Sequence, residues 1–364
     1  MRASRHNPVG HSGCSGWGEL LKFGLDLGII RFEVCRAVRR WTLSAGVGMK
    51  KTSKIVTVGL CPSWDTVCRF DGIEWGEHKL VGSSSCRPAG KALNISCALA
   101  WMGEKNTAAG LWGRDDYEEM RKAMRELRGL VRVKMTAVEG ATRRNVTVVD
   151  TLGDREMHLR FPCGLVSRKA LSQLGEDLKT IVKRDSVCVF GGLMPGSEFL
   201  DELVRIVKDC SERGAKIVVD TYGEALRRIV DTGRAWVIKP NVKELQELLG
   251  EQVADKPASL AKAARRLLDK VGIVLISRGR KGAVVVTKEG AWQGRCVGRG
   301  RVLSTVGCGD YLLGGFLKSL KDTPDVGLAL EVALKVATAK AWGWTEEKTW
   351  GQARRRIEIE GGWV

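Results

Sequence analysis

The chain has 364 residues, 44% of them hydrophobic, and a formal net charge of +18. It contains no run of 18 uninterrupted apolar residues, which argues against a membrane span. A charge of this size suits nucleic acid, an acidic membrane surface or small anionic substrates. The basic residues are scattered, with only short clusters such as Arg354 to Arg356, and zinc-finger spacing is lacking. These features favour an enzyme that handles small anions, with neither nucleic acid nor a membrane as its partner.

Residues 1–48 differ in composition from the rest of the chain. A Gly/His/Ser-rich stretch runs from Asn7 to Gly18, and an amphipathic stretch from Leu20 to Trp41 follows. Acidic residues interrupt the apolar part, which argues against a secretory signal. Met49 and a short basic lead then precede the apolar run of residues 55–58. We expect translation to start at Met49 and residues 1–48 to be a non-native or disordered extension, the alternative being a genuine N-terminal extension.

The cysteines predict free thiols. There are eleven of them, an odd number, and none are spaced as Cys-x-x-Cys. A zinc site or a disulfide framework is therefore not expected. Free thiols fit a reducing compartment, and we expect a cytoplasmic protein.

The main part of the chain predicts a doubly wound α/β fold with a small β lid. Two segments, about 66–88 and 142–162, show polar–apolar alternation, which predicts strands exposed on one face. Further along, short Val- and Ile-rich runs alternate with amphipathic segments, which predicts parallel βαβ units flanked by helices. Residues 351–364 are predicted to be a C-terminal tail. The predicted strands are 187–190, 217–219, 236–238 and 273–276, and the predicted helices are 199–210, 242–249 and 260–268.

A glycine-rich turn at Ser304–Asp310 opens directly into an apolar helix. Unpaired amides and the helix dipole at such a junction favour an anion, and Gly307 and Gly309 leave room for phosphate. Asp310 can accept a proton from a hydroxyl, so the turn suits phosphoryl transfer. The alternative is an Asp that caps the helix. A Rossmann turn lacks its third glycine here, and a Walker A loop lacks its Gly-Lys-Ser/Thr.

The same turn resembles the C-terminal signature of the PfkB (ribokinase-like) carbohydrate kinases, Asp-Thr-x-Gly-Ala-Gly-Asp. Ser304 and Cys308 depart from that signature, and Cys308 contributes through its backbone amide. The resemblance extends in order over residues 52–345 and is closest to the branch of 1-phosphofructokinase and tagatose-6-phosphate kinase. It implies a kinase domain over residues 49–350, with Asp310 as the base and the amides of Gly307, Cys308 and Gly309 around the transferring group.

Three segments resemble the substrate half of that family. Residues 89–95 are similar to Gly-Gly-Lys-Gly-x-Asn-Val, residues 61–65 to Asn-Pro-Ala-Leu-Asp, and residues 142–145 to Thr-Arg-x-Asn. Departures occur at Cys61, Trp64, Ala89 and Ala92. By resemblance, Lys91 and Arg143 bind the phosphate already on the sugar, and a bidentate guanidinium suits that role. The other substrate residues that the resemblance implies are Asp65, Gly90, Asn94 and Asn145.

The nucleotide half matches the family more closely. Residues 239–245 resemble Lys-Pro-Asn-x-x-Glu-Leu, residues 277–282 resemble Ser-x-Gly-x-x-Gly, and residues 220–226 resemble Asp-Thr-Ser-Gly-Glu-Ala-Leu. Asn241 and Glu244 then act on Mg²⁺ through water, which suits this ion. On their own they would be a helix cap with a first-turn acid. The implied ATP-binding residues are Lys239, Asn241, Ser277, Arg278, Gly279 and Gly282.

The resemblance implies ATP-dependent, Mg²⁺-assisted phosphorylation of a phosphorylated ketohexose. Fructose 1-phosphate is the first choice, because both Lys91 and Arg143 are present. Tagatose 6-phosphate, fructose 6-phosphate and an unphosphorylated sugar or nucleoside stay open as acceptors. A catalytically weak sugar-phosphate sensor is the alternative from another class. The resemblance also implies a homodimer, because lid strands in this family often pair across a dimer.

Overall fold

The computed structural model describes residues 48–364 except 128, 154 and 195. The extension predicted for residues 1–48 lies outside the described residues, apart from Gly48. Within the described part, ten strands form one sheet in the order β14-β13-β12-β11-β10-β9-β8-β1-β4-β5, and four form a second sheet in the order β3-β2-β6-β7.

The strands of the main sheet are mostly short. Those from β5 across to β11 pair in parallel, whereas β12, β13 and β14 pair antiparallel at the far edge. Their bounds are β1 Ile55–Gly59, β4 Asn106–Gly113, β5 Val131–Val138, β8 Val187–Gly191, β9 Lys216–Asp220, β10 Ala235–Ile238, β11 Val271–Ser277, β12 Ala283–Thr287, β13 Gly290–Cys296 and β14 Ile359–Trp363. All four strands predicted between residues 187 and 276 are confirmed.

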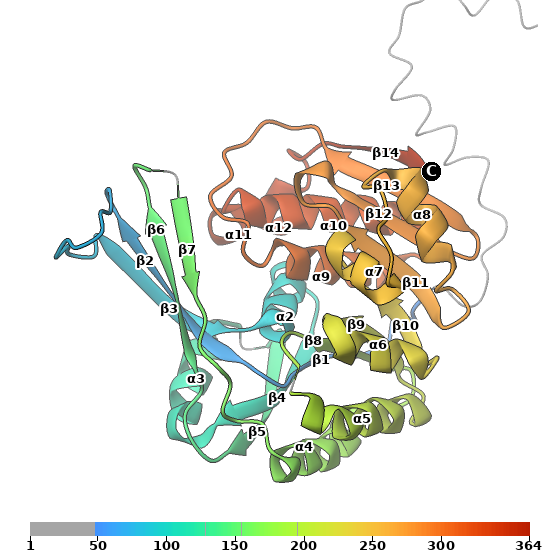
Figure 1. Ribbon diagram of the computed structural model, residues 1–364, viewed down its shortest axis with the longest axis horizontal. Coiled ribbons are helices and arrows are strands. Elements are labelled where there is room, and N and C mark those ends of the chain that lie inside the picture. The colour runs from blue at the N-terminus through green and yellow to red at the C-terminus, as the bar shows by residue number, and fades with distance from the viewer. Residues whose placement is uncertain (1–47, 128, 154, 195) are drawn as a thin grey trace, which may run out of the picture. The chain divides into compact units, whose positions relative to one another are not determined.

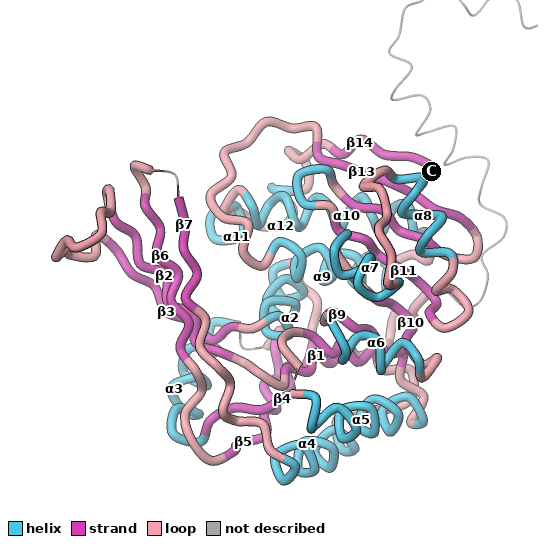
Figure 2. Tube along the Cα trace, in the orientation of Figure 1, coloured by secondary structure: helices cyan, strands magenta, loops and turns pink. Residues whose placement is uncertain are grey.

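Helices cover both faces of the main sheet, as Figures 1 and 2 show. One buried cluster packs the first face against α4 to α8, and a second packs the other face against α2, α9 and α10. A doubly wound fold is therefore confirmed. The helices are α2 Lys91–Trp101, α3 Tyr117–Ala123, α4 Arg168–Ile181, α5 Leu200–Glu212, α6 Gly223–Asp231, α7 Val242–Leu249, α8 Pro257–Arg265, α9 Cys308–Asp322, α10 Val326–Ala341, α11 Trp344–Glu347 and α12 Trp350–Ala353.

The second sheet is the predicted lid, and it extends away from the main sheet in Figure 1. It consists of β2 (Ser63–Phe70), β3 (Ser83–Ala89), β6 (Arg144–Asp150) and β7 (Arg155–Leu159). Parallel pairing of β2 with β6 aligns Asp65 with Asn145. The chain passes into the lid twice, through β2 and β3 between β1 and α2 and through β6 and β7 between β5 and α4, so the base of the lid lies beside the main sheet.

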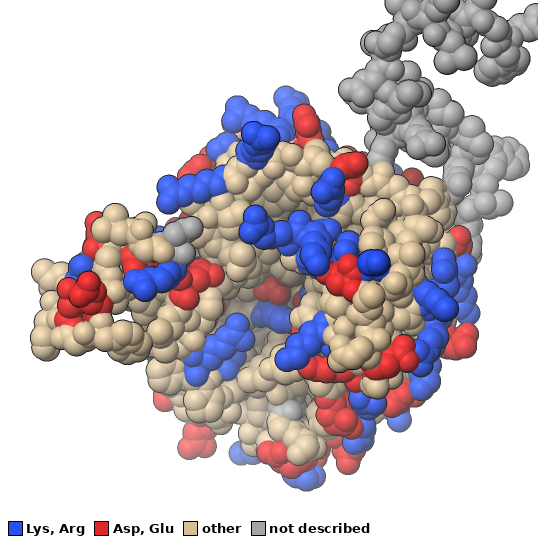
Figure 3. Space-filling view, turned by 45° about the horizontal axis from the view of Figure 1, so that its top comes forward, with Lys and Arg blue, Asp and Glu red and all other residues tan. Residues whose placement is uncertain are grey.

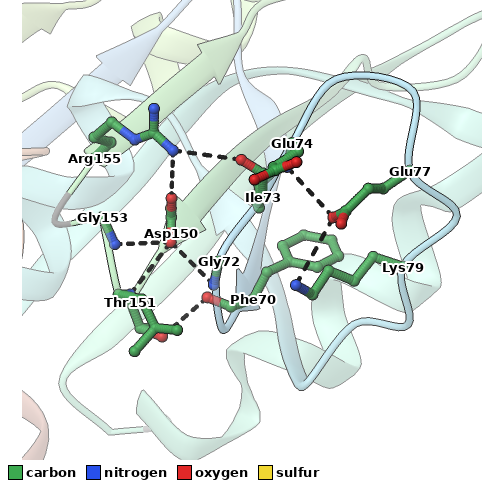
Figure 4. Close-up of polar contacts among 11 residues, drawn as sticks. Phe70, Gly72, Ile73, Glu74, Glu77, Lys79, Asp150, Thr151, Gly153 and Arg155 are labelled. Carbon is green, nitrogen blue, oxygen red and sulfur yellow. Dashed lines mark hydrogen bonds and ion pairs between the residues drawn. The ribbon is translucent and has the colours of Figure 1, made fainter.

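Asp150 organises the outer end of the lid (Figure 4). Its Oδ1 accepts hydrogen bonds from the amides of Gly72 (3.1 Å) and Gly153 (2.9 Å), and its Oδ2 pairs with the guanidinium of Arg155 at 2.7 Å. The bond from Arg155 and the amide bonds lower the pKa of Asp150 to about 2. The carboxylate thus joins the loop after β2 to the turn between β6 and β7.

The end of the chain differs from the predicted tail. Within residues 351–364, β14 pairs with β13, and the indole of Trp363 lies against that of Trp292 with ring centroids 4.2 Å apart. Short segments with two glycines carry a weak strand signal, so the sequence pattern missed this edge strand. No helix in the described part of the chain is long and apolar enough to cross a bilayer.

Candidate active site

The predicted site residues gather at the carboxyl ends of the parallel strands, where open α/β sheets bind ligands. Asp220 ends β9, Lys239 directly follows β10, and Ser277 ends β11. The amino-terminal ends of α2 and α9 approach the same edge, which places Lys91 and Asp310 there. In Figure 3 this face of the molecule is hollowed, with Lys/Arg and Asp/Glu side chains gathered in the hollow.

Asp310 lies on the first turn of α9, with only 5% of its surface exposed. Gly307, and not Asp310, is the capping residue of this helix. The Asp310 side chain instead accepts a hydrogen bond from the Asn94 side-chain amide at 2.7 Å. Burial, followed by the negative charge of Asp220, raises the pKa of Asp310 to about 7. A carboxylate with a pKa near neutrality is suited to general base catalysis.

Gly307 allows the chain to turn tightly beside this carboxylate. Its φ of 78° lies in the left-handed region, which favours glycine. A Cβ added there would lie 3.6 Å from the Asn94 amide nitrogen and 3.8 Å from Asp310 Oδ2. The Cys308 thiol points to the carbonyl of Ser304 at 3.7 Å, so its side chain does not crowd the turn. The first amides of α9, which lack partners within the helix, thus begin next to the base.

A buried charge cluster lies beside Asp310. Oδ1 of Asp220 pairs with the ammonium groups of Lys91 at 3.0 Å and Lys239 at 3.3 Å. Burial alone would raise the pKa of Asp220, but Lys239 and Lys91 outweigh it and hold that pKa below its usual value. Burial alone would lower the pKa of Lys91, but the negative charges of Asp220 and Asp310 outweigh it and raise that pKa. Lys91 is therefore held as a cation at the floor of the site, where it shares the Asp220 carboxylate with Lys239.

Sequence reasoning did not include Asp220 among the site residues, although it noticed the surrounding motif. A signal was available, because an acidic residue directly after a buried strand such as 217–219 lies at the ligand-binding edge of a parallel sheet. Lys91 and Asn94, which the resemblance assigns to the sugar phosphate and its hydroxyls, contact Asp220 and Asp310. Both side chains therefore lie beside the candidate base.

Arg143 lies at the base of the lid. Its guanidinium donates to the carbonyls of Pro62 (3.1 Å), Cys61 (2.9 Å) and Phe161 (2.8 Å). These bonds use three of its five N–H donors and leave two. The side chain also lines a surface hollow of about 450 Å³ together with Phe161 and Pro162. Arg143 is thus fixed in position and retains donors for an anion.

The two polar side chains predicted on the lid strands contact each other. Asp65 on β2 accepts hydrogen bonds from Asn145 on β6 at 3.0 Å and from the Ser63 hydroxyl at 2.8 Å, all at Oδ1. The Asn145 carbonyl oxygen accepts the amide of Phe161 at 3.1 Å. The lid therefore presents one connected polar group beside Arg143.

Trp64, which departs from the family pattern, takes part in positioning Arg143. Its indole N–H donates to Asp116 Oδ2, and Oδ1 of the same carboxylate accepts the amide of Thr142 at 3.0 Å. The Trp64 amide donates to the carbonyl of Arg143 at 2.9 Å. Asp116 is buried, and it was not found from the sequence because it belongs to none of the motifs.

Asn241 and Glu244 form a reciprocal helix cap at the start of α7. The Asn241 side chain accepts the Glu244 amide at 2.9 Å, and Glu244 Oε2 accepts the Asn241 amide at 2.8 Å. The two residues therefore form the helix cap that the sequence also allowed. The negative charge of Glu244 nevertheless contributes to the raised pKa of Lys91, so its carboxylate lies near the site. These residues fit Mg²⁺ bound through water, because the cap uses Oε2 of Glu244 and leaves the other carboxylate oxygen for a water of the ion's shell.

The turn predicted to contact ATP follows β11. Ser277 lies beside Asn241 through a parallel bridge, and Gly279 and Gly282 both have positive φ. The Arg278 guanidinium is turned away, with Nε 2.6 Å from Asp255 Oδ1 in a nearly buried ion pair. Arg278 therefore joins this turn to the chain before α8, and the backbone of the turn stays available to a ligand.

The sequence is similar to those of known sugar-phosphate kinases. The chain is 29% identical to the 1-phosphofructokinase of Haemophilus influenzae over 289 residues, which cover 77% of this chain and 90% of that protein. It is 30% identical to the 1-phosphofructokinase of Rhodobacter capsulatus over 298 residues, covering 80% and 90%.

The fold is similar to that of phosphofructokinase-2 from Escherichia coli in complex with fructose-6-phosphate. The TM-score is 0.76 at 22% identity, and the match covers 84% of this chain and 98% of that one. The model of the pfkB family carbohydrate kinases matches residues 52–342. The chain therefore belongs to the pfkB family of carbohydrate kinases.

Proposed function

We propose that this sugar kinase transfers the γ-phosphoryl group of ATP to a hydroxyl of fructose 1-phosphate, giving fructose 1,6-bisphosphate. The observation that carries the chemistry is the buried Asp310, whose pKa is raised to about 7 and whose neighbours are two paired lysines. Two observations support this acceptor. The similar proteins from Haemophilus influenzae and Rhodobacter capsulatus are 1-phosphofructokinases, and Arg143 retains two N–H donors for the sugar's phosphate.

Asp310 removes the proton from the attacking hydroxyl. Asn94 donates to one carboxylate oxygen, which orients the other toward the acceptor. As negative charge moves onto the transferring phosphoryl group, the ammonium groups of Lys91 and Lys239, both held by Asp220, balance it. Donors fixed in this way before the reaction stabilise the transition state without further reorganisation.

The amides at the start of α9 receive the oxygens of the transferring group. An anion at a helix N-terminus is favoured by free N–H groups and by the helix dipole. The neighbouring turn after Ser277 contacts the remaining phosphates through its backbone. Asn241 and Glu244 would hold Mg²⁺ through water, and the ion would supply charge neutralisation for the ATP phosphates.

Arg143 holds the phosphate that the sugar already carries. Three protein carbonyls fix the guanidinium at the base of the lid, so little side-chain freedom is lost when phosphate binds. Asp65 and Asn145 lie on the adjacent strands and suit the sugar hydroxyls. Lys91, in contrast, is paired with Asp220 and acts on the transferring group.

The Arg143→Ala variant tests the phosphorylated acceptor. Loss of a charge-assisted hydrogen bond costs about 1.5–3 kcal/mol, so the KM for fructose 1-phosphate should rise roughly 10- to 100-fold. The KM for ATP should stay within about twofold, because Arg143 lies on the lid side of the site. Steady-state kinetics with each substrate varied in turn measures both.

Arg132→Ala is the matched control, since Arg132 is exposed on β5. It removes the same charge from the chain and should change neither KM. A rise in the KM of both substrates to the same degree, or of neither, in Arg143→Ala would contradict a role in binding the sugar's phosphate.

We also propose that the lid sheets of two copies pair in a homodimer. Large apolar side chains are exposed on the lid, including Trp75 (93%), Leu80 (93%) and Leu152 (76%), and exposed apolar patches mark association surfaces. Phosphofructokinase-2 from Escherichia coli has a tetrameric inhibited form. Sedimentation velocity should give a dimer, and a monomer at micromolar concentration would contradict this.

A further inference from the structure

The chain passes between the main sheet and the lid through connections that carry a pair of cysteines. Cys61 lies between β1 and β2, where the chain enters the lid, and Cys163 lies between β7 and α4, where it leaves. One guanidinium, that of Arg143, bonds the carbonyls of Cys61 and Phe161, so the two connections are adjacent, and the side chains of the two cysteines lie next to each other although 102 positions separate them in the sequence. Sequence spacing alone could not reveal this pair, because lid pairing brings it together.

Arg143 lies between the same two connections. Its Nη2 donates to the carbonyl of Cys61 at 2.9 Å, and its Nη1 donates to the carbonyl of Phe161, two residues before Cys163, at 2.8 Å. A change in the distance between the two connections must therefore change the position of this guanidinium. The thiol pair is adjacent to the proposed phosphate-binding residue of the lid.

The pair is accessible from one side. Pro162 and Gly164, the neighbours of Cys163, line the surface hollow of about 450 Å³ that also contains Arg143. Cys163 itself is partly exposed, whereas Cys61 is buried. The hydrogen bond from Cys61, together with backbone amides and Arg143, lowers the pKa of Cys163 to about 6. A partly exposed thiolate next to a buried thiol has the form of a reactive and a resolving cysteine.

We propose that Cys61 and Cys163 form a reversible disulfide that tethers the two connections and slows turnover. The oxidant is a hydroperoxide. The Cys163 thiolate attacks its terminal oxygen, which breaks the O–O bond, releases an alcohol after proton uptake and leaves a sulfenic acid. The Cys61 thiol then displaces hydroxide, which leaves as water with the thiol proton. A dithiol returns two electrons and two protons and restores both thiols.

Another pair in the core provides an internal control. Cys188 and Cys210 are also in side-chain contact, but both are buried, with 0% and 2% of their surfaces exposed. Because an oxidant in solvent cannot reach these buried thiols, the pair should stay reduced although the two side chains are in contact. Cys86, on β3, is exposed and is not paired with another thiol in the described part of the chain, so it tests access without contact.

The test treats the reduced full-length protein with a small excess of hydrogen peroxide and maps its disulfides by peptide mass spectrometry. We expect one linked peptide pair, Cys61 with Cys163, and thiols at Cys188 and Cys210. Turnover should fall about tenfold, because tethering the base of a lid limits a conformational step. Dithiothreitol should restore it. The effect on turnover rests on the proposed function, whereas the mass measurement needs no substrate and stays valid if the proposed acceptor is wrong.

Two variants separate the pair from other thiols. Cys163→Ser should keep its basal turnover and lose the response to peroxide, while Cys86→Ser should respond as the unmodified chain does. The proposal is overturned if the Cys61–Cys163 link does not form, if it forms without lowering turnover of an otherwise active enzyme, or if Cys163→Ser is still inactivated reversibly.

Discussion

Replacement of Asp310 by Asn should lower kcat by about 10²- to 10⁴-fold, the range that a positioned general base contributes. Asn keeps the size of the side chain and can still contact Asn94, but it cannot accept the proton of the acceptor hydroxyl. The structure removes the competing explanation that Asp310 merely caps α9, since Gly307 is the capping residue. Binding of ATP should change little.

The pH dependence of kcat gives this prediction a second readout. The pKa of Asp310 is raised to about 7, so the carboxylate is the main species above that pH and the acid below it. The kcat of the unmodified enzyme should therefore fall as the pH drops through 7, and the residual activity of Asp310→Asn should lack that decrease. Turnover of the Asn variant within a few-fold of the unmodified enzyme would show that Asp310 is not the base.

Replacement of Asp220 by Asn should lower the free energy of unfolding more than any of the other substitutions proposed for this protein. The variant leaves Lys91 and Lys239 without their shared counter-charge in a buried position. Removal of one partner from a buried ion pair costs about 3–5 kcal/mol, which chemical denaturation can measure. Asp231→Asn is the matched control. Its ion pair with Lys270 is exposed, and exposed pairs are worth about 0–1 kcal/mol.

The same variant should shift the pH profile in a defined direction. The charge of Asp220 contributes to the raised pKa of Asp310, and its removal leaves two lysines that favour the Asp310 carboxylate. The pKa of Asp310 should therefore fall, and the acidic decline of kcat should move to lower pH. An unchanged decline, or one that moves to higher pH, would mean that Asp220 and Asp310 do not interact as described.

Much of the main sheet could be predicted because its strands are buried on both faces. Runs such as 187–190 and 273–276 are apolar throughout and lie between amphipathic segments, a pattern that few folds share. The lid was recognisable from alternation in residues 142–162. The glycine turn before Asp310 could be predicted as an anion site because its residues are contiguous in the sequence.

The partners of the site residues could not be predicted in the same way. Lys91 and Asp220 are 129 positions apart in the sequence, and Trp64 and Asp116 are 52 positions apart. Local periodicity carries no information about contacts at such sequence separations. Arg278 belongs to a motif, yet its side chain pairs with Asp255, which the motif does not contain. A motif identifies the chain segment, whereas tertiary packing decides which atoms of that segment point to the ligand.

The central claim is that the acceptor is a sugar that already carries a phosphate, and a substrate panel tests it most directly. The formation of ADP is measured with ATP, Mg²⁺ and, in turn, fructose 1-phosphate, fructose 6-phosphate, tagatose 6-phosphate and unphosphorylated fructose. The account predicts the highest kcat/KM with fructose 1-phosphate, and at least about 100-fold less with fructose, since the phosphate contact of Arg143 is then lost. Equal or better use of fructose would contradict it.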